Sequence, residues 1–141
     1  MDKIKKMNKV KATKLLIIDN DKGPIMRALR MSDNGYKKFG EIYFSEVFYG
    51  KIKGWKRHIQ MTMNLVVPEG LVKFVFYDPN LGSFEEYEIG TNNYIRLTVP
   101  PGLWFAFQGL EKKNLVMNVS DIEHDPIESE NKNISEIKYS W

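Results

Sequence analysis

Short runs of apolar or alternating residues, each followed by turn residues, recur along the whole chain. Examples are KLLIID before NDKG, GEIYFSEVFYG between glycines, and the successive runs LWFAFQGL and NLVMNVSD. Period-two alternation places one set of side chains on a buried face, and regularly spaced turns are typical of antiparallel sandwiches and barrels. The pattern predicts an all-β domain of roughly eight or more strands.

Local turn and helix signals refine this prediction. The runs MNLVVPEG and LVKFVFYD are separated by a Pro-Glu-Gly turn and are expected to form a hairpin. At most one short helix is expected, around PIMRALRMS, where Pro24 can begin a first turn.

Length and charge predict one domain preceded by a basic arm. A chain of 141 residues with 43% apolar and 13% aromatic content can bury a single core. The first 14 residues carry six lysines against one aspartate. We therefore expect residues 1–14 to form a basic, disordered arm and residues 15–141 to form the domain.

Several functional classes are excluded or not predicted. The chain has no cysteine, which excludes disulfides, thiolate catalysis and Cys-ligated zinc. The apolar cluster LLII is too short for a signal-peptide core or a membrane span, so we expect a cytoplasmic protein without membrane contact. A lysine-rich start is usually a solvated arm, and no nucleic-acid partner is predicted.

The stretch GKIKGWKRHIQMTMNLVVPEG, residues 50–70, has the spacing of a known motif. Its first and last glycines match the pattern G-x5-H-x-H-x3-4-E-x6-G, in which imidazoles and a carboxylate hold a divalent metal. The ligand positions fall on Lys56, His58 and Met63. A second motif, G-x5-P-x-G-x2-H-x3-N, matches at Pro100 and Gly102 in TVPPGLWFAFQG.

The glycine and proline spacing resembles that of the cupin superfamily, which implies a jelly-roll β-barrel or sandwich. The metal ligands are replaced, however: Phe105 stands where the second motif has its histidine, and only His58 remains of the four positions. Lysine is cationic at neutral pH, and methionine is a poor ligand for hard metals. No metal centre and no cofactor are therefore predicted.

Within the cupins, the chain resembles the dTDP-4-dehydrorhamnose 3,5-epimerase family and its short relatives in bacterial surface-polysaccharide biosynthesis. The resemblance spans about residues 19–141 and rests on DNDKGPIMRALR, GEIYFSEVFYGKIKGW, VKFVFYD, RLTVPPGLWFAFQGL, NVSDIEHDPIE and IKYSW. It implies a metal-independent enzyme acting on a nucleotide-linked 4-keto-6-deoxy sugar. It also implies a homodimer, because members of this family pair through their sheets.

The family's central strand carries arginine, glycine and a catalytic histidine, and IKGWKRH matches it with two changes. Lys53 stands where an arginine holds the sugar diphosphate, and Lys56 stands where the histidine removes a proton beside the carbonyl. By approximate alignment, the lysine that stabilises the enolate falls near Met63 and the tyrosine that returns a proton falls near Asn118. These replacements imply altered or reduced catalysis.

The candidate catalytic residues are Lys56 and His58. Alternation places His58 on the same face as Lys56, where it can act as acid or base; the alternative is a structural histidine with satisfied nitrogens. The candidate ligand-binding residues are Lys53, Arg96, Trp104 and Asn118. Arg96 lies between Ile95 and Leu97, and a lone arginine in an apolar strand indicates an anionic or carboxylate partner.

Two functions follow from these residues. The first is a nucleotide-sugar epimerase or isomerase, with Lys56 or His58 transferring the proton. The second is a non-catalytic cupin module that binds a nucleotide sugar or an anionic glycan. An interior filled by Phe105 and Phe107 would exclude the enzyme, whereas an open cavity holding Lys56 and His58 would favour it.

Overall fold

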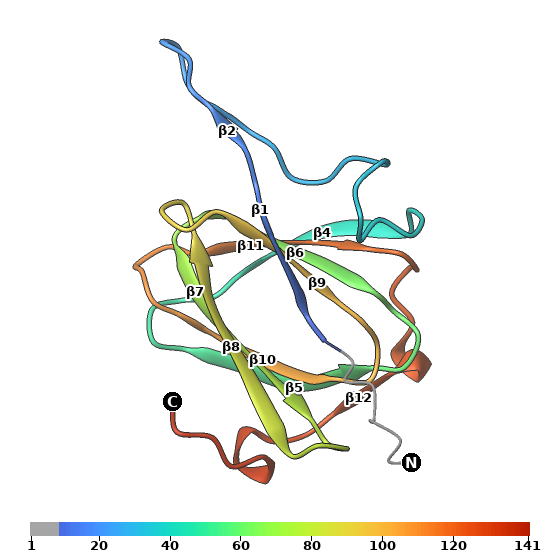
Figure 1. Cartoon of the computed structure of the whole chain (residues 1–141). Helices are drawn as coiled ribbons and strands as arrows, with labels where there is room; N and C mark the ends of the chain where they lie inside the picture. The colour runs from blue at the N-terminus through green and yellow to red at the C-terminus, as the bar shows by residue number, and fades with distance from the viewer. Residues whose placement is uncertain (1–8) are drawn as a thin grey trace, which may run out of the picture.

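Two five-stranded antiparallel sheets face each other in the computed structural model, which describes residues 9–141 (Figure 1). The first sheet has the order β1-β9-β6-β11-β4, the second has the order β12-β5-β10-β7-β8, and β2 and β3 form a separate two-stranded ribbon. The strands are β1 (Lys11–Lys14), β2 (Ile17–Ile18), β3 (Ile25–Met26), β4 (Glu41–Glu46), β5 (Ile52–His58), β6 (Met63–Glu69), β7 (Leu71–Asp78), β8 (Ser83–Gly90), β9 (Ile95–Val99), β10 (Trp104–Gly109), β11 (Leu115–Ser120) and β12 (Ser129–Asn131).

This arrangement confirms the predicted all-β sandwich. Within residues 9–141 the only helical turns are two short 3₁₀ segments, η1 (Pro126–Glu128) and η2 (Ile134–Glu136). No helix in this part of the chain is long and apolar enough to cross a membrane. No helix forms around Pro24, where at most one short helix was expected. Ile25 and Met26 pair with Ile18 and Ile17, and the resulting ribbon projects from the sandwich (Figure 1).

The first strand lies at the end of the predicted arm, residues 1–14. Residues 11–14 form β1, which pairs with β9 at the edge of the first sheet, and Val10 just before it is buried in the core. Backbone pairing holds this segment although all four of its side chains are exposed. The rest of the predicted arm, residues 1–8, lies outside the described residues.

The hairpin expected at Pro-Glu-Gly is wrong as well, because β6 and β7 belong to different sheets. Gly70 forms the corner between them with φ +91°, and a side chain there would lie 2.3 Å from the backbone oxygen of Lys113. Only glycine fits this combination of backbone angle and close approach. The hairpin partner of β7 is β8, reached through the turn that follows Asp78.

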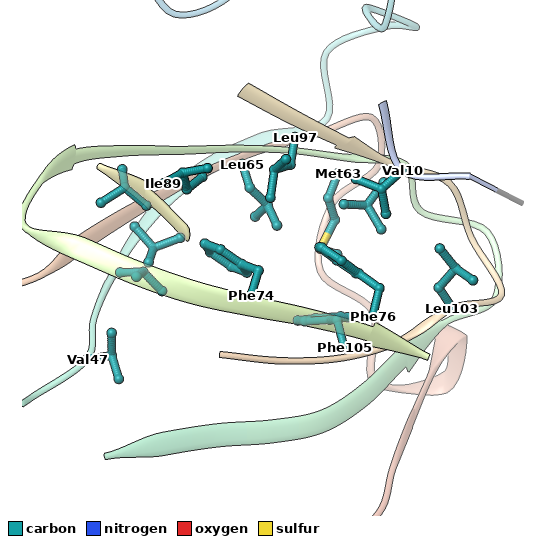
Figure 2. Packing of buried hydrophobic residues seen from close by; sticks show 14 of the residues in the cluster. Val10, Val47, Met63, Leu65, Phe74, Phe76, Ile89, Leu97, Leu103 and Phe105 are labelled. Atoms are coloured by element: carbon teal, nitrogen blue, oxygen red, sulfur yellow. The ribbon is translucent and has the colours of Figure 1, made fainter. Parts of the chain in front are cut away.

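The main core lies between the two sheets. Alternate side chains of β7 point inward, so that Phe74 and Phe76 face Leu65 of β6 and Leu97 of β9 (Figure 2). A second cluster lies on the outer face of the second sheet, where the segment after β12 packs its side chains. Its buried members are Trp55, Val75, Trp104, Ala106 and Ile137. The second sheet is therefore covered on both faces.

Candidate active site

A cavity of about 260 Å³ lies between the sheets beside the main core. One wall comes from β4, β6 and β11 of the first sheet, and the other comes from β5 and β10 of the second, with one residue of β12. Its lining residues are Tyr43, Ser45, Lys53, Gly54, Lys56, Met63, Leu65, Phe105, Phe107, Val116, Asn118 and Asn131. Phe105 and Phe107 occupy part of the interior without filling it.

A β-bulge in β5 brings two lysines to this cavity. Strict alternation would place Lys53 and Lys56 on opposite faces, yet both line the cavity. The pairing register of β5 with β10 shifts at Gly54 and Trp55, and Trp55 turns into the outer cluster. Gly54 has φ +149°, and a side chain on it would lie 2.4 Å from the Cβ of Ala106. The glycine therefore permits the bulge that gathers the two cations.

The two lysines differ in their contacts. The Lys53 ammonium donates hydrogen bonds to the Ser45 hydroxyl at 3.0 Å and to the Glu46 backbone oxygen at 2.5 Å. Neither Lys53 nor Lys56 forms an ion pair with a carboxylate of the described chain. The cavity therefore carries two positive charges that no acidic side chain between residues 9 and 141 neutralises. This arrangement favours an anionic ligand.

His58 and Glu128 form a buried pair at the end of β5. Nδ1 of the imidazole contacts Oε1 of the carboxylate in a short hydrogen bond, and the two side chains are 4% and 7% exposed. The other oxygen, Oε2, accepts three backbone N–H groups of the loop after β5, those of Ile59, Gln60 and Met61, at 3.0–3.2 Å. The carboxylate thus fixes both the imidazole and the loop that follows it.

The environment of the pair sets its protonation. Burial lowers the pKa of His58, and this effect outweighs the opposing hydrogen bond and charge of Glu128. Burial raises the pKa of Glu128, but hydrogen bonds from Gln60, His58 and Met61 bring that pKa below its ordinary value. A neutral imidazole that faces a carboxylate carries its proton on Nδ1, so Nε2 holds a free lone pair. Nε2 is buried and has no hydrogen-bond partner within residues 9–141.

Phe105 connects this pair with the cavity. Its ring stacks on the His58 imidazole, with centroids 5.8 Å apart and an interplanar angle of 18°, and it also lines the cavity. His58 itself does not line the cavity. The imidazole and Lys56 are close enough for the lysine's charge to contribute to the lowered pKa of His58.

Three predicted site residues therefore line one cavity, namely Lys53, Lys56 and Asn118, with His58 next to it. Arg96 lies elsewhere. Its guanidinium is buried outside the core face of β9, where Nη1 binds the Ala28 backbone oxygen at 2.8 Å and the Asp33 carboxylate at 3.4 Å. The carboxylate partner expected for Arg96 is thus a residue of the same chain. This side chain lines a separate cavity of about 440 Å³ beneath the β2–β3 ribbon.

Trp104 also lies away from the cavity, in the outer cluster. Neighbouring residues of β10 face opposite sides of the sheet, so Phe105 points inward and Trp104 outward. Two cations cover its ring, the guanidinium of Arg57 and the ammonium of Lys132, each 4.9 Å from a ring centroid. Trp104 is therefore a packing and cation–π residue in this structure.

Sequence reasoning missed Tyr43 and Glu128. Tyr43 sits in the alternating run of β4, where nothing distinguishes it from a packing aromatic, and its hydroxyl accepts a hydrogen bond from the Asn118 side chain at 2.9 Å. Glu128 lies in a tail whose acidic residues are typical of a solvated surface. Its burial beside a histidine 70 positions away follows only from the pairing of β12 with β5.

The described residues contain no group of three or more His, Asp or Glu side chains arranged to hold a metal ion. The donor set around His58 consists of one carboxylate, already engaged by three backbone N–H groups, and one imidazole nitrogen.

Comparisons with known proteins identify relatives with a similar sequence and fold. No family model matches the chain. The dTDP sugar isomerase of Desulfovibrio desulfuricans G20 is 35% identical, with a TM-score of 0.89 over 94% of this chain and 90% of that one. The spore coat polysaccharide biosynthesis protein SpsL of Bacillus subtilis is 24% identical over 142 aligned positions, covering 94% of each chain.

The dTDP-4-dehydrorhamnose 3,5-epimerase of Sulfolobus tokodaii shares the fold with a TM-score of 0.83 and 19% identity, covering 97% of this chain and 84% of that one. The 35% identity to the Desulfovibrio isomerase extends over nearly the full length of both chains. The chain therefore belongs to the cupin-fold family of dTDP-sugar isomerases and epimerases.

Proposed function

We propose that the protein binds a nucleotide-linked keto sugar in the cavity between the sheets and catalyses its epimerisation or isomerisation, within polysaccharide biosynthesis. The observation that carries this proposal is the buried His58–Glu128 pair beside a cavity with two unneutralised lysines. The isomerase and polysaccharide-biosynthesis relatives support the same substrate class.

Lys53 and Lys56 supply the charge for a diphosphate or a developing enolate. Lysine acts on phosphate as a point charge, without the bidentate geometry of arginine. Lys53 is held to β4 by its bonds to Ser45 and Glu46, so its ammonium is fixed at the join between the two sheets. Lys56 lies closer to His58 along the strand, where a cation can stabilise an enolate oxygen.

His58 is the proposed base. Its Nε2 lone pair takes a proton from the carbon next to the sugar carbonyl, and the electron pair of the C–H bond forms an enolate whose oxygen carries the charge. Return of a proton from solvent to the opposite face of that carbon gives the epimer. Protonation of the former carbonyl carbon instead, with the proton of the adjacent hydroxyl passing to the enolate oxygen, gives the keto isomer. Glu128 holds the tautomer that keeps the lone pair on Nε2. The phenol of Tyr43 on the opposite wall is the proposed hydrogen-bond donor to the sugar carbonyl.

Contact between a sugar carbon and Nε2 requires the Phe105 ring to shift, because this ring stacks on the imidazole and lines the cavity. The burial of Nε2 is also the specific observation that favours the second candidate function, a module that binds the nucleotide sugar without turnover.

Solvent-deuterium incorporation separates the two functions. We expect the wild-type protein to introduce deuterium into at least one dTDP-4-keto-6-deoxy sugar, detected by mass spectrometry. His58→Ala should reduce incorporation to the buffer background, Lys56→Ala should slow it, and Lys51→Ala, on the loop before β5, should leave it unchanged. Binding by calorimetry without any exchange would identify the binding module. Neither binding nor exchange with any sugar of the panel would refute both.

A homodimer is part of the proposal. β4 is an edge strand of the first sheet, and its outward residues Ile42 and Phe44 are 47% and 60% exposed. Apolar residues on an edge strand are usually covered by a partner. Analytical ultracentrifugation should give the mass of two chains, and Phe44→Glu should give the mass of one. A cytoplasmic location without nucleic-acid or membrane partners stays a prediction.

A further inference from the structure

Asn118 and Tyr43 form a polar pair on the first-sheet wall of the cavity. They face each other across β11 and β4, and the Asn118 amide nitrogen donates to the Tyr43 hydroxyl at 2.9 Å. The amide oxygen of Asn118 is buried and has no hydrogen-bond partner in the described part of the chain. Both residues line the cavity.

This unpaired oxygen stands among apolar side chains. The neighbours of Asn118 on the same wall include Met63, Leu65 and Val116, none of which can donate a hydrogen bond. Asn118 is only 2% exposed, so bulk water does not compensate for the missing partner. Buried acceptors without a donor are rare and costly in folded proteins. A hydrogen bond from a bound ligand removes that cost once the side chains around this oxygen shift to admit the ligand.

The pair offers two different groups to a ligand. The Tyr43 oxygen accepts the Asn118 amide hydrogen, and its own O–H donates to no described group. An unused acceptor and an unused donor therefore lie side by side. Two adjacent ring positions complement them when one carries a hydroxyl, which donates to Asn118, and the next carries a carbonyl, which accepts from Tyr43.

We propose that Asn118 determines specificity by accepting a hydrogen bond from the hydroxyl on the carbon next to the sugar carbonyl. This inference rests on the proposed function and deepens it, because it assigns to Asn118 the contact with the hydroxyl beside the sugar carbonyl. Sites built to bond a hydroxyl reject the analogue that lacks it, since the buried protein group is then left unpaired. The lysines on the opposite wall, Lys53 and Lys56, take no part in this selection.

The test compares the binding of two ligands by calorimetry, dTDP-4-keto-6-deoxyglucose and its 3-deoxy counterpart. The His58→Ala background blocks turnover during the measurement. With Asn118 intact, the hydroxylated sugar should bind about 10- to 100-fold more tightly, the range expected for one buried hydrogen bond. Asn118→Leu should reduce this preference to within about threefold, because leucine has a similar volume and no acceptor.

Two further variants keep the test decisive. Asn118→Asp retains an acceptor and should retain the preference, while melting curves show whether each variant is folded. If Asn118→Leu does not fold, Tyr43→Phe replaces it and should weaken binding of both keto sugars equally. Equal affinity for the two sugars with Asn118 present would overturn the inference and leave the proposed function standing. Absence of binding to either sugar by the otherwise wild-type protein would overturn both.

Discussion

Replacing Glu128 by glutamine tests the buried pair most directly. The carboxylate accepts three backbone N–H groups through Oε2 and one imidazole N–H through Oε1. A hydrogen bond to a charged acceptor contributes about 1 kcal/mol more than one to a neutral acceptor. If the glutamine oxygen keeps the three backbone bonds, Glu128→Gln should lower the free energy of unfolding by about 3 kcal/mol.

Urea unfolding at pH 7.5 measures this loss. With an m-value of about 1.5 kcal/mol/M, the midpoint should fall by about 2 M. The matched control is Glu130→Gln two residues later, whose half-exposed carboxylate pairs with Arg57 at 2.9 Å. A surface pair of this kind should cost less than about 1 kcal/mol. Equal midpoints for the two variants would show that dehydration of the Glu128 carboxylate cancels its hydrogen bonds, which refutes the reasoning.

The glutamine also changes the tautomer of the His58 imidazole. Its amide group faces Nδ1 as a donor, so His58 must accept there and place its proton on Nε2. The proposed base then has no lone pair to receive a proton. Deuterium exchange should therefore fall to background in Glu128→Gln even under conditions where the variant is folded.

Three other predictions concern stability. The pKa values of His58 and Glu128 both lie below their ordinary values of 6.5 and 4.5, so the unfolded chain binds more protons than the folded chain. The melting temperature, measured by calorimetry, should therefore fall as the pH is lowered from 7 to 5 and further below. An unchanged melting temperature would contradict this prediction. In the same urea assay, Gly54→Ala should destabilise the protein by about 2 kcal/mol or more. The control is Gly50, which has φ +73° and room for a Cβ, with no atom within 4 Å. Gly50→Ala should therefore cost only about 1 kcal/mol, for its strained backbone. Phe74→Ala in the fully buried core should cost about 3–5 kcal/mol, and a smaller loss would indicate that the core collapses around the change.

The sequence predicted the fold class because alternation and turn residues are local signals. It did not predict which strands pair, because pairing depends on residues that are distant in the sequence. Pro-Glu-Gly is good hairpin chemistry, but Gly70 directs β7 into the other sheet because the two apolar faces must cover each other. The segment around Pro24 lacks a buried face of its own and pairs as a short ribbon instead of forming a helix.

The site was predictable in part for the same reason. The spacing of residues 50–70 located the strand with Lys53, Lys56 and His58, whereas the bulge that gathers the lysines depends on contact with β10. Arg96 and Trp104 were assigned to the site by residue type alone. In the structure Arg96 binds the Ala28 backbone oxygen and Trp104 packs under the Arg57 guanidinium, so both have partners within the chain. Asn118 was placed by alignment, but its partner Tyr43 is visible only through the β4–β11 register.

The pairing of β12 with β5 has a consequence for folding kinetics. Glu128 reaches His58 only after a segment of 70 residues has been closed into a loop, and most other contacts in the described chain are also between distant residues. Chains with such high contact order fold slowly, because the entropy of loop closure is lost before the contacts form. The contact between the carboxylate and the imidazole therefore depends on one of the long loop closures of this fold. A chain in which β12 has not yet paired with β5 has Lys53, Lys56 and His58 on one strand but lacks the carboxylate that orients the imidazole, so deuterium exchange would report on complete folding.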